Sequence, residues 1–282
     1  RFPSIFTISL IKILPNISAF SNMMNRILLL AIVCLGTTTV SAQTRGITPE
    51  KLWDLGRVSM DAVSPDGETV LYGVTRYDLD ANKGNRDLYI IPAEGGQVRK
   101  ITAFEGSEYN AVFRPDGQKI GFLSGESGSS QLWEMNPDGS DLHQVSDIEG
   151  GMTGFKYSPT GDKILFTQEV KIDANMQERY PDLPLADARV IDNLMYRHWN
   201  EWEDGYYSHV FLMNYEDGAL SGEPMDIMQG ERFDSPLKPF GGLEQIAWSP
   251  DGFVVAYTCK KMNGLEYSTS TDSDIYLYDL QA

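Results

Sequence analysis

The sequence predicts an all-β protein built from repeated four-stranded antiparallel sheets, and three observations support this prediction. One tight-turn motif recurs four times, apolar residues alternate at the same positions on both sides of each copy, and further short apolar runs follow each copy. Repeats with a period of about 40–50 residues that each contain four strands are typical of the blades of a β-propeller. We therefore expect an incomplete propeller of about four to five blades.

The recurring turn consists of Ser or Arg followed by Pro-Asp-Gly or Pro-Thr-Gly. Proline presets φ at the second position, aspartate can accept a hydrogen bond from its own backbone, and glycine adopts the left-handed conformation. The four prolines are separated by 50, 44 and 91 residues, so two intervals equal one period and the third equals one period plus an insertion. The copies are Ser64-Pro65-Asp66-Gly67, Arg114-Pro115-Asp116-Gly117, Ser158-Pro159-Thr160-Gly161 and Ser249-Pro250-Asp251-Gly252.

Apolar side chains flank every copy in one register, two residues before the proline and three and five residues after the glycine. Because side chains alternate between the two faces of a strand, this register predicts two antiparallel strands that share one buried face. The positions are Val63, Phe113, Tyr157 and Trp248 before the turns, and Val70, Ile120, Ile164, Val255, Tyr72, Phe122, Phe166 and Tyr257 after them.

Further apolar runs predict the remaining strands of each blade. Third strands are expected at 88–91, 132–135, 210–213 and 275–278. In the first two repeats, glycine-containing turns then lead to short fourth strands at Ile101-Thr102 and Val145-Ser146. One helix is expected near residue 50, because Thr48 can cap it and Pro49 suits its first turn.

The amino-terminal region has the composition of a targeting segment. Arg26 precedes the apolar run 27–35, and small residues follow as far as Ala42, which is the pattern of a secretory signal peptide. We therefore expect an upstream translated segment at 1–22, a signal peptide at 23–42 and a partial propeller at 43–282 with an insertion near 168–208. The signal pattern predicts a secreted protein, located in the bacterial periplasm. About 240 mature residues at roughly 45 per blade do not close a propeller ring, which predicts a fragment of a longer chain.

Charge and composition exclude several classes of function. The chain has 282 residues with 23 Lys and Arg against 40 Asp and Glu, which gives a formal net charge of −17. Nucleic acids and anionic membrane surfaces attract basic proteins, so neither is an expected partner, and no membrane association is expected after signal cleavage. Two cysteines cannot form a disulfide framework or a four-cysteine zinc site, and we expect Cys259 to be an inert strand residue.

No metal or cofactor site is predicted. The stretch Asp78-x-Asp80-x-Asn82 is similar to a calcium loop, but its glycine comes one position late, at Gly84, and Tyr89 occupies the place of the bidentate glutamate. We interpret this stretch as an exposed loop between strands. The sequence contains no phosphate-binding loop and no dinucleotide-binding fingerprint.

Two segments carry a resemblance to a peptidase family. The opening stretch 48–59, which runs into the first turn motif, and the Trp-rich stretch 195–205, followed by His209-Val210-Phe211, resemble the prolyl oligopeptidase family, in its dipeptidyl peptidase V and acylaminoacyl peptidase branch. The resemblance covers residues 46–282. It implies an N-terminal propeller that precedes an α/β-hydrolase domain, and a Ser-Asp-His triad in that second domain.

The catalytic residues of such a peptidase are not found in this chain. A nucleophile elbow has the pattern Gly-x-Ser-x-Gly. The nearest match, at 125–129, has Ser129 in place of the last glycine and lies between two predicted strands, which favours a plain turn. We therefore expect no catalytic residue in residues 1–282, and expect the missing α/β-hydrolase domain and peptide substrates to be the partners.

The predicted insertion contains the candidate binding residues. Glu201 and Glu203 lie beside Trp199 and Trp202, and carboxylates combined with aromatic faces suit a primary ammonium. The resemblance implies that propeller glutamates hold the free N-terminus of a peptide, so that dipeptides are released. A solvated acidic loop whose tryptophans pack on the propeller is the structural alternative for these four residues.

Two functions remain open. The first is the propeller of a secreted serine dipeptidyl peptidase, which gates access and anchors the substrate amine. The second is a non-enzymatic periplasmic interaction propeller, of the TolB-like or WD40-like type. A third function, that of a glycan-processing propeller, has less support, because no pair of acid and base carboxylates stands out among so many acidic residues.

Overall fold

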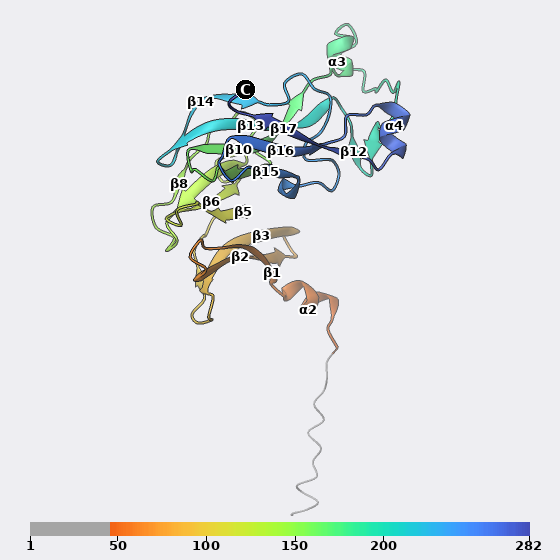
Figure 1. Ribbon diagram of the computed structural model, residues 1–282. Helices are drawn as coiled ribbons and strands as arrows, with labels where there is room; N and C mark the ends of the chain where they lie inside the picture. The colour runs from red at the N-terminus through yellow and green to blue at the C-terminus, as the bar shows by residue number, and fades with distance from the viewer. Residues whose placement is uncertain (1–45) are drawn as a thin grey trace, which may run out of the picture. The chain divides into compact units, whose positions relative to one another are not determined.

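The computed structural model describes residues 46–282, and its secondary structure is almost entirely antiparallel β-sheet (Figure 1). The predicted segments 1–22 and 23–42 lie outside the described residues. The expected first helix is confirmed as α2, Pro49–Asp54. The predicted all-β propeller is confirmed as well, with four successive blades in the described part of the chain.

Each blade is formed by consecutive strands. Blade 1 contains β1 (Arg57–Val63), β2 (Thr69–Asp78), β3 (Lys83–Pro92) and β4 (Arg99–Lys100), and blade 2 contains β5 (Glu108–Phe113), β6 (Ile120–Ser124), β7 (Gln131–Met135) and β8 (His143–Gln144). Blade 3 contains β9 (Gly154–Tyr157), β10 (Lys163–Lys171), β13 (Tyr206–Glu216) and β14 (Ala219–Asp226), and blade 4 contains β15 (Ile246–Trp248), β16 (Val254–Cys259) and β17 (Asp274–Asp279).

The recurring turns join the first two strands of each blade in the predicted register. In the first turn Gly67 has a φ of 78°, and the hydroxyl of Ser64 accepts a hydrogen bond from the Thr69 N–H at 2.9 Å. The fourth turn repeats this bond between Ser249 and Val254, also at 2.9 Å. The turn therefore fixes which residues oppose each other. The four closing pairs are Val63 with Val70, Phe113 with Ile120, Tyr157 with Ile164, and Trp248 with Val255.

The cores lie between successive blades. Neighbouring residues on one strand point to opposite faces, so Phe122 of β6 packs with blade 1 while Leu123 packs with blade 3. On β10, Phe166 faces blade 2 and Leu165 faces blade 4. All four side chains are fully buried. The two middle blades are consequently covered by apolar cores on both faces.

Two details differ from the sequence prediction. Val63 is 47% exposed, because it lies on the face of β1 opposite Ala62, which packs against the core between blades 1 and 2. The fourth strands β4 and β8 come two residues earlier than expected. Thr102 and Ser146 instead follow these strands, and their hydroxyls accept hydrogen bonds from the Leu88 and Leu132 N–H groups, both at 2.8 Å.

A buried carboxylate links blades 1 and 2. Glu108 on β5 is fully buried and accepts a hydrogen bond from the Thr102 hydroxyl at 2.8 Å. Burial raises the pKa of Glu108 to about 7, and the nearby carboxylate of Asp87 adds to this effect, while Lys100 opposes it. The proton of Glu108 is therefore held more tightly in the folded protein than in the unfolded chain.

The packing between blades gives a first prediction. Phe155 of β9 is fully buried between blades 2 and 3, so Phe155→Ala should lower the free energy of unfolding by about 3–5 kcal/mol. The matched control, Phe253→Ala, removes a ring that is 45% exposed and should cost less than about 0.5 kcal/mol. Urea denaturation of both variants measures the difference, and equal losses would contradict the assigned core.

The buried Glu108 gives a second prediction. Because its pKa rises from 4.5 to about 7 on folding, stability should fall as pH rises through this interval, by at most about 3 kcal/mol. Glu108→Gln cannot ionise and should flatten this part of the stability profile. Urea denaturation of the wild type and of Glu108→Gln at a series of pH values measures the free energy of unfolding and tests this prediction. Parallel profiles for the two proteins would show that Glu108 does not titrate in this range.

Candidate functional site

The candidate site lies where the second strand of a blade connects to the third. In blade 3 this connection is the segment 172–205, between β10 and β13, and in blade 4 it is the segment 260–273, between β16 and β17. Both connections are at the end of the blades opposite the four recurring turns, because strand directions alternate. Together with residues 237–239 they enclose a cavity of about 240 Å³.

Local interactions order the start of the blade 3 connection. Asn175 begins helix α3 (Met176–Arg179) with a capping box, in which the Asn175 side chain accepts the Glu178 N–H at 3.0 Å and the Glu178 carboxylate accepts the Asn175 N–H at 2.9 Å. Lys171, at the end of β10, pairs with Glu178. These contacts attach the helix to the blade.

A hairpin and a glycine complete the connection. Strands β11 (Arg197–His198) and β12 (Glu201–Trp202) pair across a tight turn in which Trp199 has a φ of 47°. Gly205 then leads into β13 with a φ of 81°, and its carbonyl accepts the Ile172 N–H at 2.9 Å. A Cβ atom at Gly205 would lie 2.7 Å from the Asp173 carbonyl oxygen, so only glycine fits this junction.

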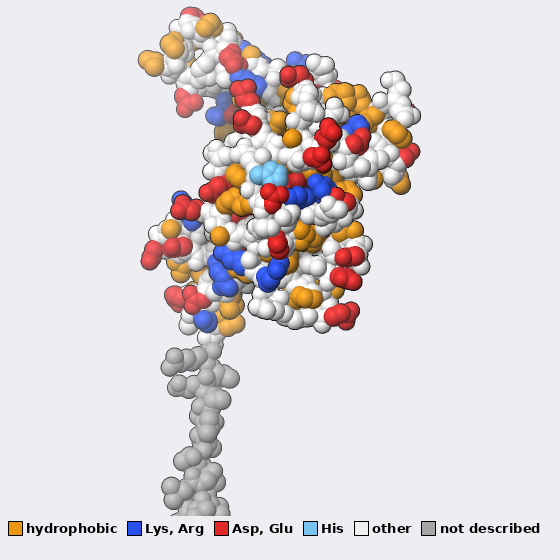
Figure 2. Space-filling model, turned by 90° about the vertical axis from the view of Figure 1, so that its left-hand side faces the viewer, with side chains coloured by type: hydrophobic (Ala, Val, Ile, Leu, Met, Phe, Trp, Pro, Cys, Tyr) orange, Lys and Arg blue, Asp and Glu red, His pale blue; other side chains and the backbone are white. Residues whose placement is uncertain are grey.

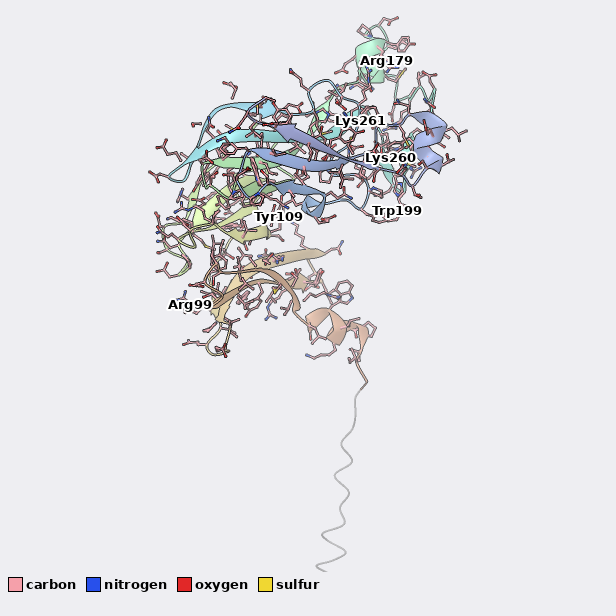
Figure 3. All side chains as sticks on the ribbon, in the orientation of Figure 1. Arg99, Tyr109, Arg179, Trp199, Lys260 and Lys261 are labelled. Carbon is pink, nitrogen blue, oxygen red and sulfur yellow. The ribbon has the colours of Figure 1, made fainter. Side chains whose placement is uncertain are left out.

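The structure places the four predicted residues in different surroundings. Glu201 is exposed on the hairpin, opposite His198. Trp199 is 70% exposed, and its ring meets that of Phe240 edge-on at 5.2 Å. Glu203 lines the cavity, whereas Glu201, Trp199 and Trp202 do not. Figure 3 shows Trp199 and Lys260 at the same end of the blades, close to α4 (Gly264–Thr269).

Trp202 already has cationic partners from within the chain. Its ring lies 4.3 Å from the Arg189 guanidinium and 4.9 Å from that of Arg197. Arg189 also donates two hydrogen bonds to the carboxylate of Asp204, at 3.0 and 3.1 Å. Trp202 therefore holds the segment around residue 189 against the hairpin, which is a structural contact of the insertion.

Glu203 is the half-buried carboxylate of the cavity. Its backbone N–H donates to the Tyr196 carbonyl at 3.0 Å, but its carboxylate makes no hydrogen bond within residues 46–282. Burial raises the pKa of Glu203, and the carboxylate of Asp234 adds to the effect, while the ammonium of Lys238 opposes it. Glu203 therefore presents an acceptor that a ligand can use.

The remaining polar groups of the cavity were not predicted from the sequence. Lys260 donates to the carbonyls of Tyr267 and Ser270, both at 2.5 Å, and lies 4.6 Å from the Tyr267 ring. Burial raises the pKa of Tyr267 to about 12, with Asp234 and Glu203 adding to it. No motif marks these residues, and the one signal was the charged pair at 260–261 directly after an apolar strand.

Other segments considered in the sequence have structural roles. The Asp78 carboxylate accepts the N–H groups of Asp80 and Ala81, both at 2.9 Å, and so stabilises the loop between β2 and β3. The segment 125–128 is the expected turn between β6 and β7. Cys259 is fully buried on β16, and burial raises the pKa of its thiol to about 12, so it is not an activated nucleophile.

The described residues show neither a metal-binding cluster nor a membrane-spanning helix. Within residues 46–282 no group of three or more His, Cys, Asp or Glu side chains is arranged to hold a metal ion. In the same region no helix has the length and apolar character needed to cross a bilayer. Acidic and basic side chains are both spread over the face shown in Figure 2.

Comparison with known proteins agrees with the propeller and the predicted resemblance. Residues 54–192 match the TolB beta propeller domain family. The chain is 44% identical over 234 residues to dipeptidyl-peptidase 5 of Porphyromonas gingivalis, covering 83% of the chain and 34% of that protein. It is 35% identical over 243 residues to dipeptidyl-peptidase 5 of Porphyromonas endodontalis, covering 86% of the chain and 35% of that protein.

A solved structure supports the fold. The acylaminoacyl peptidase of Pyrococcus horikoshii superposes with a TM-score of 0.56 at 15% identity, over 80% of this chain and 31% of that one. At this identity the likeness concerns the fold alone. The chain spans about a third of the length of the curated relatives that it matches.

The junction at Gly205 gives a third prediction. Gly205→Ala should destabilise the protein by roughly 1–3 kcal/mol, because alanine is strained at this φ and its Cβ would contact the Asp173 carbonyl. Gly125→Ala is the control, since nothing lies within 4 Å of a Cβ there and its φ is not left-handed. Thermal or urea denaturation measures both. A loss at Gly125 that matches the loss at Gly205 would refute this account.

Proposed function

We propose that this chain, a propeller portion of a peptidase of the prolyl oligopeptidase family, belongs to a secreted serine dipeptidyl peptidase. We further propose that this propeller holds the substrate amine. In this proposal the chemistry belongs to an α/β-hydrolase domain outside residues 1–282. The propeller binds the free N-terminus of a peptide and gates its access, so that dipeptides are released.

The observation that carries the proposal is the Glu203 carboxylate. It lines the cavity, is half-buried, and makes no hydrogen bond within residues 46–282. An ammonium that enters the cavity can form a charge-assisted hydrogen bond with it, which is stronger in a partly desolvated site than in water. Glu201 is exposed and faces solvent, so the assignment narrows from two glutamates to Glu203.

The local charge also favours a cationic ligand. The carboxylates of Asp234 and Glu169 act electrostatically on Glu203, and the ammonium of Lys238 and the ring of His198 oppose them. Lys260, which also lines the cavity, is held by two backbone carbonyls. An added ammonium would lower the repulsion that the Asp234 and Glu169 carboxylates exert on the Glu203 carboxylate.

The blade 3 connection supports the gating part of the proposal. A second cavity of about 510 Å³, which Glu203 also lines, lies within the insertion. Figure 1 shows α3 clear of the four sheets, and its residues line this second cavity at the end of the blades opposite the recurring turns. Peptides that approach Glu203 from this end pass the insertion, whose position therefore affects their entry.

The proposed amine site gives a fourth prediction. In the peptidase that contains this chain, Glu203→Gln should raise the KM for substrates with a free N-terminal amine by roughly tenfold to a hundredfold, because a charge-assisted hydrogen bond is lost. Glu201→Gln is the matched control and should change the KM by less than about twofold, because Glu201 lies outside the cavity.

The contrast between free and N-acetylated substrates makes this test specific. Glu203→Gln should lose the preference for the free amine, and Glu201→Gln should keep it. Steady-state kinetics on both substrate forms measures this. A Glu203→Gln enzyme with unchanged KM and unchanged preference for a free amine would defeat the proposal.

A further inference from the structure

Lys238 is a half-buried cation at the base of the cavity, and three elements hold it. Its ammonium lies 2.7 Å from the Glu169 carboxylate of β10 and 3.3 Å from the Asp234 carboxylate, and it donates to the Tyr206 carbonyl of β13 at 3.4 Å. Its side chain lines the same cavity as Glu203. This ammonium therefore joins the two long strands of blade 3 to the cavity wall.

The partner Asp234 is fixed by the backbone. Its carboxylate accepts the Ser208 N–H at 2.8 Å, and the next residue, Ser235, donates its N–H to the Ser208 carbonyl at 2.8 Å. Glu169 lies directly opposite Ser208 in the pairing of β10 with β13. The carboxylates of Glu169 and Asp234 are thus both anchored at the Glu169–Ser208 pair of β10 and β13. The Lys238 ammonium between them therefore has little freedom to move.

The charges around Lys238 explain what its removal would do. Glu169, Asp234 and Glu203 face it from β10, the 234–238 segment and the hairpin, and His198, Lys260, Tyr267 and Asp272 complete the titratable lining of the cavity. Burial lowers the pKa of Lys238, but Asp234 and Glu169 outweigh this effect and the pKa is raised. Without this cation three carboxylates would repel one another at close range.

We propose that Lys238 is a positioning residue, whose ammonium, bound by Glu169 and Asp234, holds the cavity wall in place and leaves the Glu203 carboxylate available for the incoming ammonium. This role rests on the function proposed above for Glu203. Lys238 itself does not contact the substrate amine. Its own partners, Glu169 and Asp234, bind it, so that Glu203 remains the acceptor available to the ligand.

Titration of Glu203 tests this role without any assay of activity. Carboxyl-carbon NMR of the intact protein follows Glu203 in the wild type, in Lys238→Gln and in Lys238→Arg. Lys238→Gln should shift the titration of Glu203 to higher pH, because a neighbouring positive charge is lost, and Lys238→Arg should leave it close to that of the wild type. An unchanged titration in Lys238→Gln would overturn the proposal.

A second variant keeps the test decisive if Lys238→Gln does not fold. Glu169→Gln removes a negative charge near Glu203 and leaves the cation in place, so Glu203 should titrate at lower pH. A shift to higher pH, or no shift, would contradict the proposed arrangement of charges.

Binding of a peptide separates this inference from the function on which it rests. The probe is alanyl-alanyl-alanine amide, compared with its N-acetylated form, by calorimetry at pH 6 and pH 8. Lys238→Gln should weaken binding of the free amine more at pH 6 than at pH 8, because Glu203 then titrates at higher pH, and Lys238→Arg should restore the binding. Equal weakening at both pH values would overturn the inference, whereas wild-type binding by Glu203→Gln would overturn the amine site itself.

Discussion

The alternation of side chains along each strand is the constraint on which this structure depends. The recurring turn fixes the pairing of the first two strands, and this pairing decides which face of the blade each apolar residue occupies. On β6 and β10, adjacent residues such as Phe122 and Leu123 then fill the cores on the two sides of one sheet. A shift of one residue would exchange these faces and leave both cores badly packed.

In each blade the recurring turn and the connection between the second and third strands lie at opposite ends. The recurring turns lie at one end and repeat with little change, since Ser64 and Ser249 make the same hydrogen bond. The connections between second and third strands lie at the other end, where length is free to vary because no strand register depends on them. Blades 3 and 4 use this freedom to build the cavity that contains Glu203, Lys238 and Tyr267.

Much of the fold could be predicted from the sequence, because turn chemistry and a period of two residues are local properties. The site could be predicted only in part. The sequence shows a Trp-rich segment that contains Glu201 and Glu203. Which of these two carboxylates lines the cavity depends on the hairpin turn at Trp199 and on tertiary contacts. Lys238 and Tyr267 come from segments about 35 and 64 residues away from Glu203, so no local pattern could have connected them with it.

The most direct measurement of the central claim is a structure of the full-length protein with a bound, uncleaved peptide that has a free N-terminus. The account predicts that the peptide ammonium lies within about 3 Å of the Glu203 carboxylate, with Lys238 still bound by Glu169 and Asp234. A peptide whose N-terminus lies elsewhere, with the Glu203 carboxylate contacted only by water, would contradict it.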